Sequence, residues 1–341
     1  MKQIFYIIPI STILVFFLVK LWLNLAKSKN LFDIPNKRSS HSVPTLKGGG
    51  IAIIFVFYLF LSLIFIKSPW LEPNYYYALL VGGGSIAFIS FLDDIYELPI
   101  LFRLSVQFFS AFVTLSLLGG LASIEIYTYQ IDQGFIINVL AAFFIVWMIN
   151  LYNFMDGING LASFEIIFSS LSLFFLCVYF DKSIILWFPP LLLGSCSLGF
   201  LFWNYPRARV FMGDVGSGFI GYAIAAFVIF SSWKDQDIFW VWLILLAVFI
   251  SDTTFTLLLR IFRSEKFYHA HKDHLYQLLS RYSSQNYALF SILSFNLIWL
   301  FPISFLVTNN NFSGFTGVCF AYIPLLIIYI YYRIKINPDN L

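Results

Sequence analysis

The sequence predicts an all-α integral membrane protein with about 11 transmembrane helices, and two observations carry this prediction. Hydrophobic residues make up 60% of the 341 residues and charged residues only 11%, whereas soluble domains carry about 25% charged residues. The mean hydropathy of +0.85 implies more apolar surface than a water-soluble fold of this length could bury. Strand-like alternation is absent over most of the chain, which argues against a membrane barrel.

Apolar segments of the length that crosses a bilayer, about 20 residues, recur along the whole chain. The first is longer than a signal-peptide core and its basic residues mostly follow it, so we expect it to be retained as a helix. The expected helices are 3–24, 48–66, 76–92, 101–118, 135–150, 161–180, 184–202, 212–230, 237–259, 288–307 and 315–332.

Basic residues divide unevenly between the two sides of this arrangement. Of the 20 lysines and arginines, only Lys2, Lys67, Lys182 and Lys234 fall on one side. Basic residues favour cytoplasmic loops, so the N-terminus is expected in the periplasm and the C-terminus in the cytoplasm. The sequence shows no second domain, and residues 1–341 are expected to form one transmembrane catalytic domain. Its cytoplasmic loops lie near 25–47, 93–100, 151–160, 203–211 and 260–287.

The acidic motif FLDDIYE (91–97) lies at the expected cytoplasmic end of the third helix. On a helix, Asp93 and Glu97 share a face, and Glu97 also neighbours Asp94. Carboxylates this close repel each other unless a cation or a proton lies between them. Mg²⁺ suits such a site because it takes oxygen ligands together with phosphate oxygens. Two alternatives stay open. The motif could be a solvated helix end, or it could belong to a membrane prenyltransferase, a class of enzyme that also uses paired acids.

A polar stripe ends the fifth helix, where Asn150, Asn153 and Asp156 recur every three residues and Asn159 follows. Polar groups at membrane depth are costly unless they face a cavity or a partner. Asparagine offers a donor and an acceptor side by side, which suits a base or a sugar. A polar helix end followed by a glycine stop is the alternative.

Asp214, in FMGDVGSG (211–218), opens the eighth helix. The flanking glycines would let a phosphate approach free backbone N–H groups, although an aspartate at this place is also an ordinary helix cap. Lys47, which precedes three glycines, and Arg207, in the loop 203–211, are basic candidates for contact with substrate phosphate. A basic membrane anchor explains Lys47 equally well.

Three of the four histidines, His269, His271 and His274, lie in the expected cytoplasmic loop 260–287. Their spacing differs from the HExxH zinc motif. We therefore interpret them as polar, cationic neighbours of a diphosphate. A solvated basic loop that attracts anionic headgroups is the alternative.

Taken together and in this order, five stretches resemble the polyprenyl-phosphate N-acetylhexosamine-1-phosphate transferases, also called glycosyltransferase family 4. The resemblance extends from about Lys37 to Gln277, and the helix count fits the branch that initiates lipopolysaccharide and O-antigen synthesis. The matching stretches are PTLKGGG, FLDDIYELP, NLYNFMDGINGLA, FMGDVGSGF and HAHKDHLYQLL.

The resemblance implies transfer of a HexNAc-1-phosphate from a UDP-HexNAc donor to a polyprenyl phosphate such as undecaprenyl phosphate, with release of UMP. It also implies Mg²⁺ or Mn²⁺, and a site at the cytoplasmic face of a bacterial inner membrane. The reaction would begin O-antigen or other cell-surface polysaccharide assembly. The net charge of +3 says little about partners; we expect no nucleic acid, and a homodimer stays open.

Site roles follow from the same resemblance, position by position. The third acid of the usual DDxxD is Glu97 here, and the peptidoglycan branch often has Asp where this chain has Asn159. The histidine motif is closer to the O-antigen initiators, which points away from UDP-muramoyl-pentapeptide as donor. The implied catalytic residues are Asp93, Asp94, Asp156, His269, His271 and His274; the substrate-binding residues are Asn150, Asn153, Asn159, Lys47, Arg207 and Glu97; the metal ligands are Asp214 and Asp94.

Two questions stay open at this point. The acceptor phosphate could attack the β-phosphorus directly, with Asp93 positioning or deprotonating it, or the reaction could pass through an aspartyl-phosphate. A membrane transporter of an anionic or sugar substrate is the main rival function. It would place its acids near the bilayer midplane, whereas here the acids of the motifs lie at the cytoplasmic ends of the expected helices, apart from Asp252.

Overall fold

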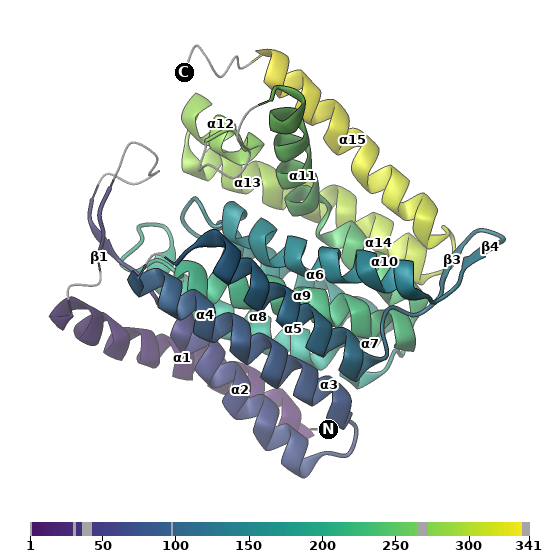
Figure 1. The fold of residues 1–341 in the computed structure, drawn as a ribbon, viewed down its shortest axis with the longest axis horizontal. Helices are drawn as coiled ribbons and strands as arrows, with labels where there is room; N and C mark the ends of the chain where they lie inside the picture. Colours follow the sequence, from purple (N-terminus) through teal and green to yellow (C-terminus); the bar gives the residue numbers. More distant parts are fainter. Residues whose placement is uncertain (1, 30–31, 36–42, 97, 265–271, 336–341) are drawn as a thin grey trace.

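The computed structural model describes residues 2–29, 32–35, 43–96, 98–264 and 272–335. Ten helices in these ranges are long and apolar enough to cross a membrane, and a bent helix pair counts as an eleventh crossing when it is taken as one span. The chain is thus an all-α polytopic membrane protein, which confirms the predicted fold class (Figure 1).

Eleven membrane-crossing segments follow one another along the chain, three of them assembled from consecutive helical pieces. The segments are α1 (Lys2–Ser28), α2 (Gly50–Lys67), α3–η1–α4 (Pro73–Tyr77, Ala78–Gly82, Gly83–Tyr96), α5 (Ile100–Leu118), α6 (Phe135–Met155), α7 (Leu161–Tyr179), α8 (Ile184–Asn204), α9 (Gly213–Lys234), α10–α11 (Gln236–Leu245, Ala247–Phe262), α13–η2–α14 (Gln285–Phe295, Asn296–Leu300, Phe301–Thr308) and α15 (Gly314–Lys335).

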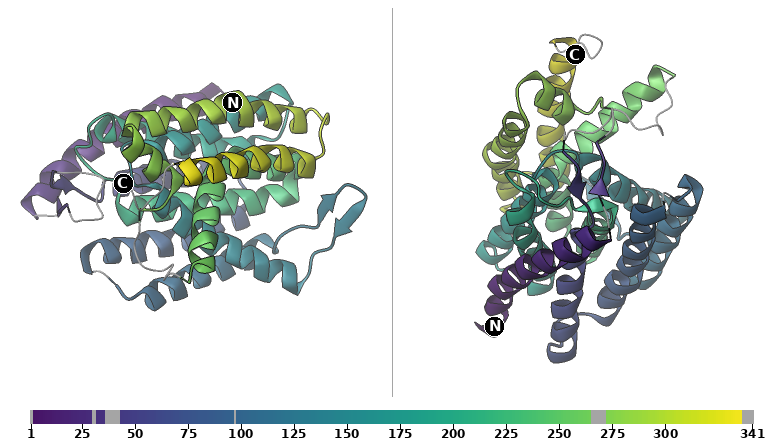
Figure 2. Two further views of the ribbon diagram at one scale, coloured as in Figure 1. Left: turned by 90° about the horizontal axis from the view of Figure 1, so that it is seen from above. Right: turned by 90° about the vertical axis from the view of Figure 1, so that its left-hand side faces the viewer.

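Three features differ from the expected succession of helices and loops. The expected ninth helix is broken at Leu246, and α10 and α11 meet at 61°. A short helix, α12 (Leu275–Tyr282), occupies part of the expected loop 260–287. Two small antiparallel hairpins connect helices, and the second projects from the bundle (Figure 2). Their strands are β1 (Phe32–Asp33) with β2 (Thr45–Leu46), and β3 (Ile124–Ile126) with β4 (Tyr129–Ile131).

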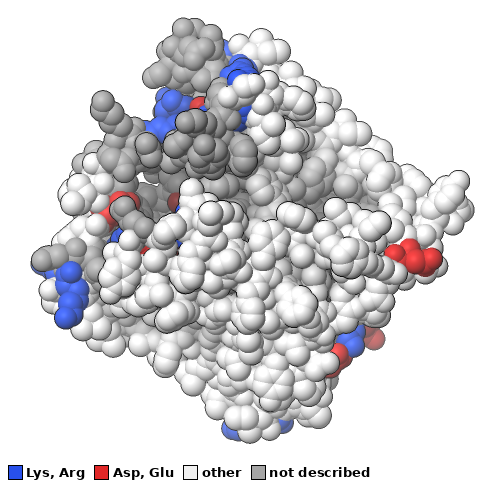
Figure 3. Space-filling model, viewed as in Figure 1, with Lys and Arg blue, Asp and Glu red and all other residues white. Residues whose placement is uncertain are grey.

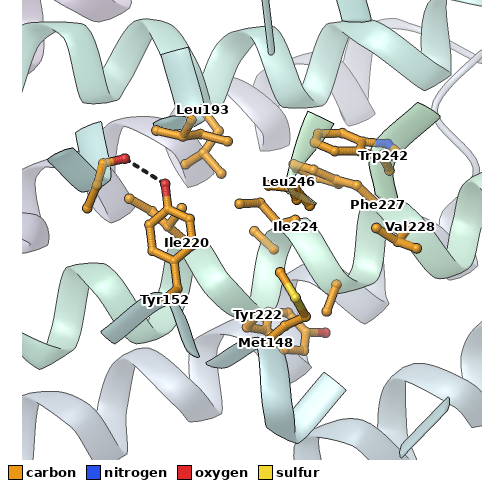
Figure 4. Close-up of a cluster of buried hydrophobic side chains, with 14 of the residues drawn as sticks. Met148, Tyr152, Leu193, Ile220, Tyr222, Ile224, Phe227, Val228, Trp242 and Leu246 are labelled. Carbon is orange, nitrogen blue, oxygen red and sulfur yellow. Dashed lines mark hydrogen bonds between the residues drawn. The ribbon is translucent and has the colours of Figure 1, made fainter. Parts of the chain in front are cut away.

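Helix α9 is the centre of the bundle and packs against α2, α4, α6 and α10. Figure 4 shows its side chain Phe227 beside Trp242 of α10, and its side chain Ile220 beside Tyr152 of α6. The hydroxyl of Tyr152 donates a hydrogen bond of 2.6 Å to the carbonyl of Ala162, so this polar group is satisfied within the apolar core.

Glycines allow the helices around α9 to approach closely, as is common where helices associate within a membrane. A Cβ atom on Gly50 of α2 would lie 2.3 Å from the Cα atom of Gly216 in α9. A Cβ atom on Gly221 would lie 2.5 Å from the carbonyl oxygen of Met148 in α6. Backbone meets backbone at both places, so a larger residue would have to separate the helices.

We expect Gly50→Ala to lower the thermal unfolding midpoint of the purified protein, because its methyl group cannot be accommodated without moving α2 away from α9. Overpacking of this kind costs about 1–3 kcal/mol. Gly84→Ala is the matched control, since a Cβ atom on Gly84 meets nothing within 4 Å and alanine favours the helix by up to about 1 kcal/mol. Equal midpoints for Gly50→Ala and the wild type would contradict this close contact.

Charged side chains gather at the edges of the view in Figure 3, and the broad region between them is white. At one end of the bundle, the ammonium of Lys182 lies 2.6 Å from the carboxylate of Asp235, and Lys234 pairs with Glu72. The other end holds the ion pairs Arg103–Asp93 and Lys47–Asp94. This distribution suits a protein whose apolar middle lies in lipid and whose two ends meet water.

Candidate functional site

Four helices meet at one end of the bundle around a small polar cavity of about 20 Å³. This space is large enough for about one water molecule. The sequence-predicted residues Asp93, Asn150, Asn153 and Asp214 all line it, from the end of α4, the last turns of α6 and the start of α9. The structure thus brings together three motifs that are up to 121 positions apart in the sequence. Ser90 of α4 and Arg103 and Gln107 of α5 complete the polar lining.

Asp93 and Asp94 are consecutive, yet their carboxylates contact different groups. Successive helix residues point about 100° apart. The carboxylate of Asp93 accepts a hydrogen bond of 2.7 Å from the backbone N–H of Leu98 and lies 2.5 Å from the guanidinium of Arg103. Asp93 therefore ties the end of α4 to the start of α5, and its side chain is buried.

Asp94 instead caps the N-terminus of α9. Its carboxylate accepts hydrogen bonds from the backbone N–H groups of Asp214, at 3.4 Å, and Val215, at 3.1 Å. A carboxylate is favourable there because the first N–H groups of a helix lack partners within the helix. Gly213 has φ of +76°, and a Cβ atom on it would lie 2.8 Å from the Asp94 carboxylate. The ammonium of Lys47 lies 3.8 Å from the same carboxylate.

Arg103 joins the two acids of the cavity and was not among the residues predicted from the sequence. Its guanidinium lies 2.5 Å from a carboxylate oxygen of Asp93 and 3.8 Å from one of Asp214. Its buried Nε atom has no hydrogen-bond partner within the described ranges, and a buried donor without a partner is costly. An anionic oxygen that entered the cavity would satisfy this donor. The available signal in the sequence was that Arg103 is the one basic residue between Lys67 and Lys182.

The two asparagines of the predicted polar stripe are held by neighbours from other helices. The amide of Asn150 donates a hydrogen bond of 2.7 Å to the side chain of Gln107 in α5. The side-chain oxygen of Asn153 accepts one of 3.1 Å from the hydroxyl of Ser217 in α9. Polar groups at this depth are therefore paired across helices, and both asparagines also line the cavity.

Asp156 follows the last residue of α6 and is half-buried. Burial raises the pKa of its carboxyl well above the ordinary value, and the negative charges of Asp214 and Asp94 raise that pKa further. A carboxyl whose pKa is raised by its surroundings is typical of groups that act as an acid or a base. Its predicted catalytic role remains a prediction.

We expect the stability of the protein to depend on pH through Asp156. Because the folded-state pKa is raised, the folded protein binds more protons than the unfolded chain. The contribution is fully present below the unfolded pKa of about 3.9 and is lost as pH rises through the folded pKa. Thermal unfolding of the wild type and Asp156→Asn from pH 4 to pH 8 tests this. The wild type should lose stability relative to the variant as pH rises, and a constant difference would contradict the raised pKa.

His274 lies in a cluster of its own, beside the end of α6. Its ring packs against the rings of Phe154 and Tyr276, with centroids 6.0 Å and 5.9 Å away, and its Nδ1 atom lies 3.6 Å from the carboxylate of Asp252. That carboxylate also accepts hydrogen bonds from the backbone N–H groups of Leu275 and Tyr276, at 2.7 Å and 2.9 Å. Asp252 thus anchors α12 on α11.

Tyr276 connects this cluster to the cavity side of the bundle. Its hydroxyl donates a hydrogen bond of 2.9 Å to the carbonyl of Phe154, two residues before Asp156. A Cβ atom on Gly157 would lie 2.0 Å from that hydroxyl, so the turn after α6 fits closely over the tyrosine. His274 is therefore fixed near Asp156 rather than in the lining of the cavity, and its predicted role is untested.

Two further predicted residues, Asn159 and Arg207, lie in loops and not in the lining of the cavity. The amide of Asn159 donates a hydrogen bond of 3.1 Å to the carbonyl of Pro206 and joins two loops at this end of the bundle. Arg207 is exposed in the neighbouring loop. Their roles in substrate binding stay predictions. Glu97, His269 and His271 lie outside the described residues.

The donor set of the cavity fits a hard divalent cation together with an anionic ligand. Asp93, Asp214, Asn150 and Asn153 offer carboxylate and amide oxygens, which Mg²⁺ prefers. No group of three or more histidine, cysteine or acidic side chains within the described ranges could hold a metal ion by itself. Mg²⁺ commonly binds through one or two carboxylates and substrate phosphates, so Asp214 and Asp93 would suffice once a phosphate is present.

The part of the chain that forms the cavity matches a known protein family. The family model for glycosyl transferase family 4 matches residues 76–232, which contain both acids of α4, the stripe of α6 and Asp214. The chain is 28% identical to a probable undecaprenyl-phosphate N-acetylglucosaminyl 1-phosphate transferase of Bacillus subtilis, over 82% of this chain and 77% of that protein. It is 32% identical to a decaprenyl-phosphate N-acetylglucosaminephosphotransferase of Mycobacterium leprae, over 56% of this chain and about half of that protein (52%).

A third relative has a different printed activity. The chain is 28% identical to a phospho-N-acetylmuramoyl-pentapeptide-transferase of Streptococcus uberis, over 66% of this chain and 69% of that protein. The first two relatives name a polyprenyl phosphate and N-acetylglucosamine. The third names a phospho-N-acetylmuramoyl-pentapeptide, so the relatives differ in the sugar that they name.

Proposed function

Because the chain belongs to glycosyl transferase family 4, we propose that it transfers a HexNAc-1-phosphate from a UDP-HexNAc donor to a polyprenyl phosphate such as undecaprenyl phosphate. An oxygen of the acceptor phosphate attacks the sugar-bearing β-phosphorus of the donor. One P–O bond forms, the diphosphate bond to UMP breaks, and UMP leaves. The products are UMP and a polyprenyl diphosphate-linked HexNAc.

The cavity between α4, α5, α6 and α9 supports this proposal more than any other observation. Two phosphates must meet in this reaction, so repulsion between anions is the main barrier, and cationic groups offset it. Arg103 supplies a cation with a buried donor that has no partner within the described ranges, and Lys47 supplies a second cation beside Asp94. The acceptor phosphate is already ionised at pH 7, so strong base catalysis is not required.

The chain's own residues would orient the reactants. Arg103 would bind a donor phosphate oxygen while it holds Asp93 and Asp214 in place. Asn150 and Asn153 line the cavity and would contact the nucleotide or the sugar. A bound Mg²⁺ or Mn²⁺, held by Asp214 and Asp93 or Asp94, would neutralise phosphate charge and polarise the diphosphate.

Position in the cell follows from charge. The topology expected from the sequence assigns 16 of the 20 basic residues to the side on which the motifs of the cavity fall, and basic residues favour the cytoplasmic side. We place the reaction at the cytoplasmic face of a bacterial inner membrane, where nucleotide sugars are made. The histidine motif supports a first step in O-antigen or cell-surface polysaccharide assembly and a donor other than UDP-muramoyl-pentapeptide.

A turnover assay tests the proposal. Purified protein receives undecaprenyl phosphate, Mg²⁺ and one of several donors, including UDP-GlcNAc, UDP-QuiNAc, UDP-FucNAc and UDP-muramoyl-pentapeptide, and UMP release is measured. We expect UMP with one HexNAc donor, and none without acceptor or after addition of EDTA. Folded protein that releases no UMP with any donor contradicts the proposal, and binding of a UDP-sugar without turnover would then favour a transporter.

A further inference from the structure

A glutamate that takes no part in the proposed reaction lies buried inside α7. Glu165, the fifth residue of α7, and Asn296, the first residue of η2, are both 0% exposed. The side-chain amide of Asn296 donates a hydrogen bond of 2.7 Å to the carboxyl oxygen Oε2 of Glu165. Acidic residues inside membrane-crossing helices are rare and commonly functional, so this contact calls for an explanation.

The contact leaves one oxygen of each side chain unsatisfied. Oxygen Oε1 of Glu165 and oxygen Oδ1 of Asn296 are buried and accept no hydrogen bond within the described ranges. Buried acceptors of this kind are destabilising, and a single donor shared by the two oxygens would satisfy both. A proton on Oε1 is such a donor, because a neutral carboxyl has an O–H group and the amide oxygen is an acceptor. Planar carboxyl and amide groups can then pair edge to edge through two hydrogen bonds.

Within the described part of the chain, the helices around Glu165 offer no cation that could balance a negative charge. The main packing partners of α7 are α6, α8, α10, α13 and α14, and none of these helices contains a lysine, an arginine or a histidine. The hydroxyl of Tyr152 in α6 already donates to the carbonyl of Ala162. A carboxylate without a partner is very costly in such surroundings, and a buried acid takes up a proton instead.

We propose that Glu165 stays protonated and forms an acid–amide pair with Asn296. In this pair the carboxyl O–H donates to Oδ1 of Asn296, and the amide N–H donates to Oε2 of Glu165. The pair satisfies both buried oxygens without placing a charge inside the membrane. It fixes η2 and α13 against α7 and thereby holds α12 beside the helices of the cavity.

The acid–amide pair lies where it can hold the C-terminal helices in place. In the π-helical turn η2, the N–H of Phe301 bonds to the carbonyl of Asn296, five residues earlier, and such turns are frequent at functional sites. Helix α13 leads from Asn296 back to α12, and these two helices pack together (Figure 1). Helix α12 carries Tyr276, whose hydroxyl bonds to the carbonyl of Phe154 in α6. A shift of η2 would therefore be passed on to the last turn of α6.

Infrared spectroscopy tests the protonation of Glu165 without any activity. Purified wild type and Glu165→Gln are compared at pH 7, and we expect the C=O stretching band of a protonated carboxylic acid in the wild type and its loss in the variant. Asp156→Asn is the control and should keep the band that Glu165→Gln loses. In Asn296→Leu the band should move to higher frequency, because the acid has lost its acceptor. Loss of a carboxylate band in Glu165→Gln, or an unmoved band in Asn296→Leu, would overturn the proposal.

Thermal unfolding tests the pairing through two hydrogen bonds. In Glu165→Gln the new side chain offers a carbonyl and an N–H on one edge, so we expect nearly the wild-type midpoint. Glu165→Ala and Asn296→Ala should each lower the midpoint by several degrees, and the double variant should lower it little further, because both changes remove one interaction. Glu125→Ala, at an exposed glutamate of β3, is the matched control and should leave the midpoint unchanged. Equal losses in Glu165→Gln and Glu165→Ala, or alanine effects that simply add, would contradict the acid–amide pair.

UMP release provides a third measurement, and it rests on the proposed transferase function. We expect wild-type kcat in Glu165→Gln. In Glu165→Ala, kcat should fall about tenfold, as for a small misplacement of groups at a reaction site, while the KM for the UDP-sugar changes little. Wild-type kcat in Glu165→Ala would refute the hold on α12. A wild type that releases no UMP refutes the proposed reaction and leaves the acid–amide pair to the infrared and unfolding results. If an alanine variant fails to fold, the infrared comparison with Glu165→Gln decides alone.

Discussion

Asp214→Asn is expected to lower kcat for UMP release by about three orders of magnitude while the protein stays folded. The carboxylate of Asp214 faces the polar cavity, is 37% exposed and lies 3.8 Å from the guanidinium of Arg103. An amide of the same shape removes the negative charge and the strongest oxygen donor for a divalent cation. A thousandfold loss corresponds to about 4 kcal/mol, the size expected when a metal clamp on a phosphoryl group is lost.

The measurement is UMP release across a Mg²⁺ titration, with thermal unfolding recorded for each protein. Asp237→Asn is the matched control, because it makes the same chemical change beside Lys182 at the opposite end of the bundle. We expect the control to retain wild-type kcat. An Asp214→Asn protein with more than a tenth of wild-type activity and the same Mg²⁺ dependence would show that Asp214 does not act at the reacting phosphates.

Arg103→Ala is expected to have the second-largest effect, a fall in kcat/KM of about a hundredfold, or about 2.7 kcal/mol. The guanidinium separates Asp93 from Asp214, and without it the two carboxylates repel each other. The variant also loses the buried Nε donor that would meet a phosphate oxygen. Arg103→Lys should recover only part of the activity, because an ammonium keeps the charge but lacks the planar array of donors.

Steady-state kinetics with the donor and the acceptor varied separately measure this effect. We expect the KM for the UDP-sugar to rise more than the KM for the lipid, since Arg103 lines the polar cavity in which we propose that the donor diphosphate binds. Arg209→Ala is the control; Arg209 lies over the ring of Trp203 at the same end of the bundle. A loss in Arg209→Ala as large as in Arg103→Ala would indicate a general effect of positive charge on this surface.

Much of the fold could be predicted because a bilayer imposes one length on every crossing helix. The helix pattern and the polar motifs of α4, α6 and α9 follow from that rule. The 61° bend at Leu246 could not be predicted, since neither proline nor glycine marks it. Helix α12 also escaped prediction, because its stability comes from Asp252, whose carboxylate binds the N–H groups of Leu275 and Tyr276 across a long loop.

In the candidate site, the sequence predicted which residues take part but not which side chains they contact. The expected topology put Asp93, Asn150 and Asp214 on the same side of the membrane, and the structure places them around one cavity. Partners from other helices carried no local signal in the sequence. The contacts of Arg103 with Asp93, and of Gln107 with Asn150, depend on how α5 packs between α4 and α6, which no periodicity encodes.

The central place of α9 has a consequence for how the protein is made. Chains are synthesised and inserted from the N-terminus, and α9 is the eighth crossing segment, so α2, α4 and α6 enter the membrane before the helix on which they pack. Until residues 213–215 arrive, Asp94 lacks the backbone N–H groups that it caps. The acidic end of the protein is therefore completed late in biogenesis. If synthesis stops before residue 213, the inserted helices lack α9, and the carboxylate of Asp94 lacks its backbone partners.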